Sequence, residues 1–347
     1  MTTAPDTPDF TLDRPGALIA SLPAVLGFVP EHSLVLVTVV DGALGCVLRI
    51  DLSEDMGEAL AHLAEVAAAA EPDGAIAVIV DPDGMDCDPC DSGHQKTTAT
   101  LADDLAAHGV ELLAAHVVDE VALGGRWYCV DGCGHGGIIE DPSASPLAMA
   151  AVLDGRRLYR HRDELQQLVA ADAARAGRLR TLIVSLPTTP SSTPQVRRDV
   201  VAALATAEEF AGGEAVSDER MAELAVALTH PQVRDMLYAL AVGEKAAAAE
   251  ALWAELARAL PEPWRAEALV LLAFSAYVRG DGPLAGISLD AALQAVPAHR
   301  MAGMLDVALH TGMQPHQIRE LALSGYRQAG RLGVRLPPRR TFSGRPR

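Results

Sequence analysis

The sequence is poor in aromatic residues and has no long uncharged apolar run. Phe, Trp and Tyr together make up 4% of the 347 residues, although half of all residues are apolar. The apolar half excludes a low-complexity, disordered body. Alanine-rich helices pack closely without large side chains, so this composition favours layers of helices. A chain of this length is typical of two domains.

Signals for membranes or secretion are also missing. A transmembrane helix needs about 18 consecutive apolar residues, and no such run occurs. The first ten residues carry neither a positive cluster nor an apolar segment, so no secretory signal is predicted. We therefore expect a cytoplasmic protein with no membrane partner. In that compartment cysteines are expected to be reduced thiols or metal ligands; the five are Cys46, Cys87, Cys90, Cys129 and Cys133.

Positive charge is scarce except at the C-terminal end. The formal net charge is -18, but residues 327–347 hold seven arginines and no acid. The acidic remainder repels nucleic acid, so we expect no nucleic-acid binding except through this tail. We expect 327–347 to be a basic, disordered tail, with folding back onto the acidic body as an alternative.

Recognisable catalytic motifs are absent. The chain contains no G-x-S-x-G, no H-E-x-x-H and no P-loop, and its eleven histidines show no ligand spacing to one another. A glycine-rich loop at 132–137 precedes no helix start and has no lysine nearby, so it is weak evidence for a nucleotide. The sequence leans away from an enzyme without excluding one.

The N-terminal half alternates strand and helix patterns. Residues 1–14 are predicted to be a frayed N-terminus, and residues 15–190 an α/β domain. Continuous β-branched runs at Leu34–Val40 and Ala75–Val80 are typical of buried strands, with a helix at 56–70 between them. This alternation predicts a mixed sheet flanked by helices. Asp41-Gly42 predicts a hairpin whose returning strand is Leu44–Ile50. Further predictions are a helix over Thr97–His108 and strands over Glu111–Val118, Arg126–Val130 and Thr181–Leu186.

The C-terminal half is predicted to be a helical domain over 191–326. A Pro/Ser/Thr-rich stretch at 187–194 is the predicted linker. Ala285, Leu289, Ala292 and Pro297 follow the spacing of the second helix of a tetratricopeptide repeat, and Pro263 lies 34 residues before Pro297. Three antiparallel helix pairs are expected, near 232–260, 264–296 and 299–326. An ordinary helical bundle uses the same small residues and stays an alternative.

Three stretches of the chain bring a family to mind. They are PGALIASLPAVLGFVPEHSLVLV from Pro15, RWYC ending at Cys129 with Cys133 four residues on, and SPLAMAAVLDG from Ser145 leading to RDEL at Arg162. In this order they resemble the actinobacterial family catalogued as domain of unknown function 4192. The resemblance covers most of the chain and implies no particular activity. The family often shows a doubled cysteine where this chain has Cys133 followed by Gly134.

The cysteines form two close pairs, each on a loop after a predicted strand. Cys87 and Cys90 form C-x-x-C, and Cys129 and Cys133 form C-x-x-x-C. Two knuckles of this spacing can supply the four ligands of a tetrahedral zinc ion. The sequence-based hypothesis is that all four bind one structural Zn²⁺, with no other cofactor implied and with His94 and His135 as reserve ligands.

Two other interpretations of these thiols remain open. They are free thiols without a ligand, or the C-x-x-C is a redox motif of the kind found after a strand and before a helix. The redox interpretation is disfavoured because the next helix is predicted to begin only near Thr97. Neighbouring aspartates are also expected to raise the thiol pKa values.

The functional expectation combines these features. With no catalytic motif and a repeat-like helical end, we expect a non-enzymatic interaction or regulatory protein with a protein or peptide partner. The alternatives are an enzyme with its site at the sheet edge near the two cysteine loops, or a structural-zinc protein. Whether a small molecule binds is not indicated.

Overall fold

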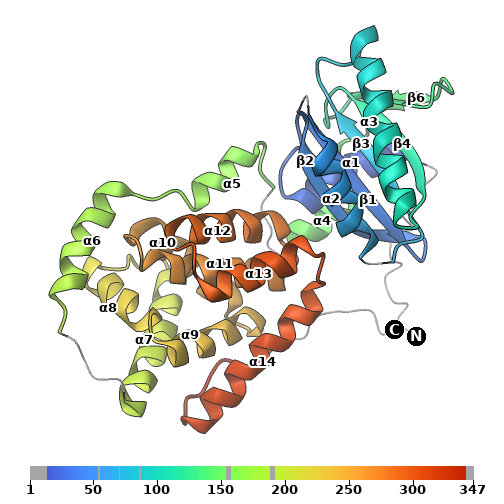
Figure 1. The fold of residues 1–347 in the computed structure, drawn as a ribbon. Helices are drawn as coiled ribbons and strands as arrows, with labels where there is room; N and C mark the ends of the chain where they lie inside the picture. The colour runs from blue at the N-terminus through green and yellow to red at the C-terminus, as the bar shows by residue number, and fades with distance from the viewer. Residues whose placement is uncertain are drawn as a thin grey trace, which may run out of the picture. The chain divides into compact units, whose positions relative to one another are not determined.

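The protein, seen in a computed structural model, folds into two compact units that meet in sequence between Arg162 and Asp163. The structure describes residues 14–53, 55–69, 71–85, 87–153, 158–187 and 192–340. The first unit contains the sheet and the second only helices (Figure 1). An α/β fold with a mixed sheet is therefore confirmed.

The division between units comes earlier than the boundary expected at residues 190 and 191. Residues 163–187 belong to the helical unit rather than to the α/β unit. Residues 1–13 of the predicted frayed N-terminus and 188–191 of the predicted linker lie outside the described residues.

Six strands form one sheet in the order β2-β1-β3-β4-β5-β6. Only β3 and β4 run parallel, and each other neighbouring pair is antiparallel. Asp41 and Gly42 both have positive φ, as the turn of the predicted hairpin between β1 and β2 requires. The strands are β1 (Ser33–Val40), β2 (Ala43–Asp51), β3 (Gly74–Val80), β4 (Leu112–Val118), β5 (Arg126–Cys129) and β6 (Gly136–Ile138).

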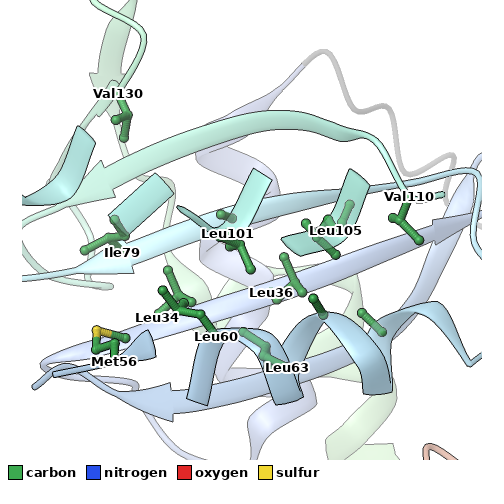
Figure 2. Packing of buried hydrophobic residues seen from close by; sticks show 14 of the residues in the cluster. Leu34, Leu36, Met56, Leu60, Leu63, Ile79, Leu101, Leu105, Val110 and Val130 are labelled. Atoms are coloured by element: carbon green, nitrogen blue, oxygen red, sulfur yellow. The ribbon is translucent and has the colours of Figure 1, made fainter. Parts of the chain in front are cut away.

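Helices α2 (Gly57–Ala68) and α3 (Asp88–Ala107) pack on one face of this sheet. Leu34, Leu36 and Ile79 from the strands meet Leu60 and Leu101 from the helices (Figure 2). Each of these side chains is at most 2% exposed, and burying one contributes about 1.5–3 kcal/mol. This layer is therefore the core of the α/β unit.

The opposite face of the sheet is buried as well. Val35 and Val78, which alternate with the residues of the first face, are fully buried. Helix α1 (Pro15–Leu26) approaches this side, because a Cβ at Gly16 would lie 3.3 Å from the indole nitrogen of Trp127. α1 also packs against α4 (Pro146–Leu153), which follows a short 3-10 turn.

Helix α3 begins nine residues before the predicted start at Thr97, and that prediction was wrong. Cys87 is its N-cap residue, and Pro89 lies in its first turn. Proline is favoured there because its missing N–H has no intrahelical partner to lose. The first turns carry polar side chains and no apolar stripe, so hydrophobic periodicity did not mark them.

The second unit consists of helices, and in the described part of the chain no helix is long and apolar enough to cross a bilayer. The α-helices are α5 (Arg162–Leu168), α6 (Ala173–Ser185), α7 (Thr193–Ala211), α8 (Asp218–Leu228), α9 (Pro231–Leu237), α10 (Ala246–Ala259), α11 (Arg265–Val278), α12 (Gly282–Ala295), α13 (Arg300–His310) and α14 (Pro315–Arg331), with a 3-10 segment, η2, at Tyr238–Val242.

Helix α11 is the centre of this unit. Its residues from Ala268 to Val278 are all buried, and it contacts α8, α9, α10, α12, α13 and α14. A repeat in a solenoid contacts only its neighbours, whereas a bundle surrounds a central helix. The expected pair at 264–296 does form, as α11 and α12, but a tetratricopeptide-like arrangement is not confirmed.

The strand predicted over Thr181–Leu186 is wrong, because these residues lie in and just after α6. Leu179 and Ile183, four residues apart, are its buried positions, while Val184 is 72% exposed. The β-branched run therefore coincided with a helix whose apolar face packs against α8 and α10.

The basic tail is ordered over its first part, which corrects the expectation of disorder for 327–340. α14 continues to Arg331, and the chain then returns along η2. The Tyr326 hydroxyl donates to Pro337 O at 2.9 Å, and Arg340 N donates to Val242 O at 3.0 Å. Folding back onto the body thus applies to 327–340, and residues 341–347 lie outside the described residues.

Candidate functional site

The four cysteines of the predicted zinc site occupy two different places in the α/β unit. Cys87 caps α3 and Cys90 lies in its first turn. Cys129 ends β5, and Cys133 lies in the turn that leads to β6. All four side chains are at least partly exposed.

Strand alternation separates the two pairs. Tyr128 and Val130 flank Cys129, and both pack with the core beneath α2 and α3, where Figure 2 shows Val130. The Tyr128 hydroxyl donates to Asp91 Oδ1 of α3 at 3.2 Å. Because successive side chains of a strand point to opposite faces, Cys129 points away from α3. The structure therefore does not bring all four sulfurs together.

Cys129, Asp131 and Cys133 form a cluster whose ligand atoms all lie within 4.8 Å of one another. The turn that gathers them has positive φ at Gly132 and Gly134, a conformation that glycine adopts without strain. Cys133 N donates to Asp131 Oδ1 at 3.0 Å. Two of the four predicted ligands, Cys129 and Cys133, thus lie together with the carboxylate of Asp131, which stands between them in the sequence.

His116 of β4 lies beside Cys129 of this cluster, but its ring nitrogens are not within 4.8 Å of all three ligand atoms. It pairs directly with Cys129 across the two strands, so the two side chains share one face. His116 Nδ1 lies 3.6 Å from Cys129 Sγ, and the residue is 4% exposed. Burial lowers the pKa of His116, so its ring is neutral at pH 7. The sequence did not single out His116 as a ligand, because only the strand register places it beside Cys129.

The acid–base properties of the cluster differ from group to group. Burial raises the pKa of Cys129 to about 11, and hydrogen bonding with Cys133 adds to this. Hydrogen bonds from Cys133 lower the pKa of Asp131. At neutral pH the cluster therefore holds a carboxylate, a neutral imidazole and a protonated thiol at Cys129, which must lose its proton before binding a metal.

The other pair, Cys87 and Cys90, has a distinct environment. Hydrogen bonding with Cys87 is the largest cause that raises the pKa of Cys90 to about 11. Burial and the charges of Asp81 and Asp83 raise it further. The expectation that nearby aspartates raise a thiol pKa is therefore confirmed for Cys90.

A third group of titratable residues lies at the carboxyl end of β3. Ligand atoms of His32, Asp81 and Asp83 lie within 4.8 Å of one another, and His94 Nε2 lies 2.9 Å from Asp81 Oδ2. Sequence reasoning did not find His32, because it comes just before β1 and reaches Asp81 only through the antiparallel pairing of Ser33 with Val80. These groups are polar neighbours of Cys90, not of Cys129.

The comparisons with known proteins identify a family. The family model described as domain of unknown function (DUF4192) matches residues 15–316, and the chain belongs to this family. No curated protein and no solved structure gives a significant match.

Proposed function

We propose that the α/β unit of this DUF4192 member holds one Zn²⁺ ion, with Cys129, Cys133, His116 and Asp131 as its ligands. One observation carries this proposal: His116 Nδ1 lies 3.6 Å from a thiol that already shares a 4.8 Å cluster with Cys133 and Asp131. The proposal keeps half of the sequence-based ligand set and replaces Cys87 and Cys90.

The donor set has the chemistry that zinc prefers. Structural zinc sites take thiolate, imidazole and carboxylate ligands in a tetrahedron. With Zn–N near 2.0 Å and Zn–S near 2.3 Å, a tetrahedral ion separates its nitrogen and sulfur ligands by about 3.5 Å. The observed 3.6 Å between His116 and Cys129 agrees with that separation, and binding by all four ligands requires the turn that holds Asp131 and Cys133 to close towards His116. His116 is also in the neutral form that binds a metal.

The expected role of this ion is structural rather than catalytic. Four ligands from the protein leave no open position for water or substrate. β5 and β6 contain only four and three residues, and all of β6 is exposed, so little apolar burial holds the turn between them. A metal that joins this turn to β4 would supply the missing stabilisation. This supports a non-enzymatic protein over an enzyme at the sheet edge.

The zinc content of purified variants tests the proposal. The full chain, purified without a metal-affinity tag, is expected to carry about one equivalent of zinc, and Cys129→Ser and Cys133→Ser to carry less than about a tenth. Cys87→Ser and Cys90→Ser are the matched controls and should keep the metal. Zinc below about a tenth of an equivalent in the unmodified chain, or its loss in the controls, contradicts the assignment.

For the helical unit we propose an interaction role, which one specific observation favours. Met304 and Val307 lie one turn apart on α13 and are 50% and 62% exposed. Adjacent exposed apolar side chains are typical of surfaces that bind protein segments. A tetratricopeptide-like groove for a peptide is the finer form of this proposal.

Charged substitutions on α13 test the interaction role. A protein recovered with the full chain should be lost with Met304→Asp combined with Val307→Asp. It should be retained with Val184→Asp, which changes an apolar residue on α6 that is even more exposed, at 72%. Recovery of the same proteins by all three forms of the chain contradicts an interaction through α13.

A further inference from the structure

The first turn of α3 contains two thiols that the proposed metal site does not use. Cys87 is the N-cap residue of this 20-residue helix, and Cys90 is its third helical residue. Side chains at these two positions meet in ordinary capping boxes, where each bonds the backbone of the other. Cys87 and Cys90 occupy these two positions, so their thiols lie on the same turn and within reach of each other.

The helix start changes how this motif is interpreted. From the sequence, the C-x-x-C lay well before the next helix, which disfavoured redox chemistry. In the structure the motif forms the helix N-terminus, and Pro89 directly precedes Cys90. The partial positive charge of a helix N-terminus stabilises a thiolate at the cap position.

The two thiols differ in the charged groups around them. Cys90 faces the charges of Asp81 and Asp83 in addition to Cys87, and its pKa of about 11 keeps it protonated at neutral pH. Among the described residues near this turn, His94 is bound to Asp81 and Tyr128 to Asp91. The position of Cys87 at the helix N-cap assigns it as the nucleophile and Cys90, one turn further into the helix, as the resolving thiol.

We propose that Cys87 and Cys90 form a reversible dithiol–disulfide pair that exchanges with disulfides of low-molecular-weight thiols or of proteins. The Cys87 thiolate attacks one sulfur of the incoming disulfide, and one thiolate leaves. The Cys90 thiol then loses its proton and attacks Cys87, which forms the internal disulfide and releases the second thiolate. The two protons pass to the two leaving thiolates, so the incoming disulfide gains the two electrons that the pair loses.

This proposal is independent of the metal site. Cys129 and its partners lie on the other face of the sheet, as the packing of Tyr128 and Val130 with the core requires. Zinc bound at Cys129 can therefore be present or absent while Cys87 and Cys90 react.

Thiol trapping in the full chain tests the proposal. The chain is equilibrated with reduced and oxidised glutathione at a series of ratios, quenched with acid, unfolded and alkylated. We expect five alkylated cysteines at the reducing end and three at the oxidising end, with the disulfide in the peptide that spans residues 87–90. Five alkylated cysteines at every ratio, or a disulfide that involves Cys46, Cys129 or Cys133 instead, overturns it.

Two single variants test the asymmetry. Cys90→Ser should accumulate a mixed disulfide with glutathione at Cys87 approaching one equivalent, whereas Cys87→Ser should accumulate less than about a tenth at Cys90. Cys46→Ser is the matched control and should still form the internal disulfide. Equal trapping at the two positions, or more at Cys90, overturns the assignment of Cys87 as nucleophile, and the circular dichroism of each variant establishes that it is folded.

Discussion

The polar side chains of the two units have different environments. In the helical unit, charged groups near the core are matched with one another at close range. In the α/β unit, thiols, carboxylates and histidines gather in small clusters at the ends of strands and remain partly exposed. Groups that are already satisfied stabilise a fold, whereas accessible clusters can bind or react. This difference is the reason for which we propose metal binding and thiol chemistry in the α/β unit.

The ion pairs around α11 are examples of charged groups matched at close range. Glu267 accepts from Arg234 Nη1 at 3.0 Å and lies 3.2 Å from His299 Nε2. Arg279, at the end of the same helix, donates to Glu250 and to Asp281. These groups hold α11 among its neighbours, although Arg234 Nε and Arg279 Nη1 are buried without a hydrogen-bond partner among the described residues.

The largest effect should come from the core of the helical unit. Phe274 on α11 is 1% exposed, and its ring lies 4.8 Å from that of Tyr238. Phe274→Ala should lower the free energy of unfolding by about 3–5 kcal/mol, measured by urea denaturation. The exposed control Val184→Ala should change it by less than about 0.5 kcal/mol. A loss below about 1 kcal/mol for Phe274→Ala would show that α11 is not the central helix.

Removing the charge of Glu267 should have the next largest effect, with a defined dependence on pH. Burial alone would raise the pKa of Glu267, but hydrogen bonds from His299 and Arg234 outweigh it and lower the pKa. The stabilisation is therefore complete above the unfolded-state pKa, about 4.3, and is lost as the pH falls towards the folded-state pKa.

At pH 7, Glu267→Gln should cost about 3 kcal/mol, because it leaves Arg234 without its buried partner. The difference from the unmodified chain should shrink below about pH 4. Glu223→Gln, on an exposed pair with Arg220, is the control and should be close to neutral. Urea denaturation at several pH values measures both variants, and a cost that grows as the pH falls would contradict the assigned pairing.

Metal removal should affect only the α/β unit. At a free zinc concentration 100 times the dissociation constant, bound zinc adds about 2.7 kcal/mol to the stability of the unit that holds it. A chelator should therefore lower the thermal transition of the α/β unit in calorimetry and leave that of the helical unit in place. An equal shift of both transitions would place the metal elsewhere.

The smallest effect belongs to the ordered part of the basic tail. The Arg339 guanidinium lies 6.0 Å from the centre of the Tyr326 ring, a distance typical of a weak cation–π contact. Arg339→Ala should cost about 0.5–1 kcal/mol of stability, with Arg335→Ala as the control. Stronger destabilisation by Arg335→Ala than by Arg339→Ala would contradict this contact.

Much of the α/β fold could be predicted from local patterns. β-branched runs marked β1 and β3, and Asp41-Gly42 marked the hairpin, because these signals depend on a few adjacent residues. The start of α3 could not be predicted from the sequence, because its first turns are polar and carry no hydrophobic periodicity. The Thr181–Leu186 run predicted a strand but lies in and just after α6, because the packing of this helix overrides the strand preference of its branched side chains.

The candidate site was harder to predict than the fold. Spacing alone grouped Cys129 with Cys133, and that pairing holds in the structure. Which further residues join them depends on strand register, and register places His116 beside Cys129 and turns both away from Cys87. No local pattern in one sequence carries that information.

X-ray absorption at the zinc edge tests the central claim most directly. The spectrum of the zinc-loaded full chain counts the sulfur ligands and measures their distance from the metal. The account predicts two sulfurs near 2.3 Å and two nitrogen or oxygen ligands near 2.0 Å. Four sulfurs near 2.3 Å would restore the four-cysteine site expected from the sequence, and a shell of nitrogen and oxygen alone would move the metal away from Cys129; either result contradicts the account.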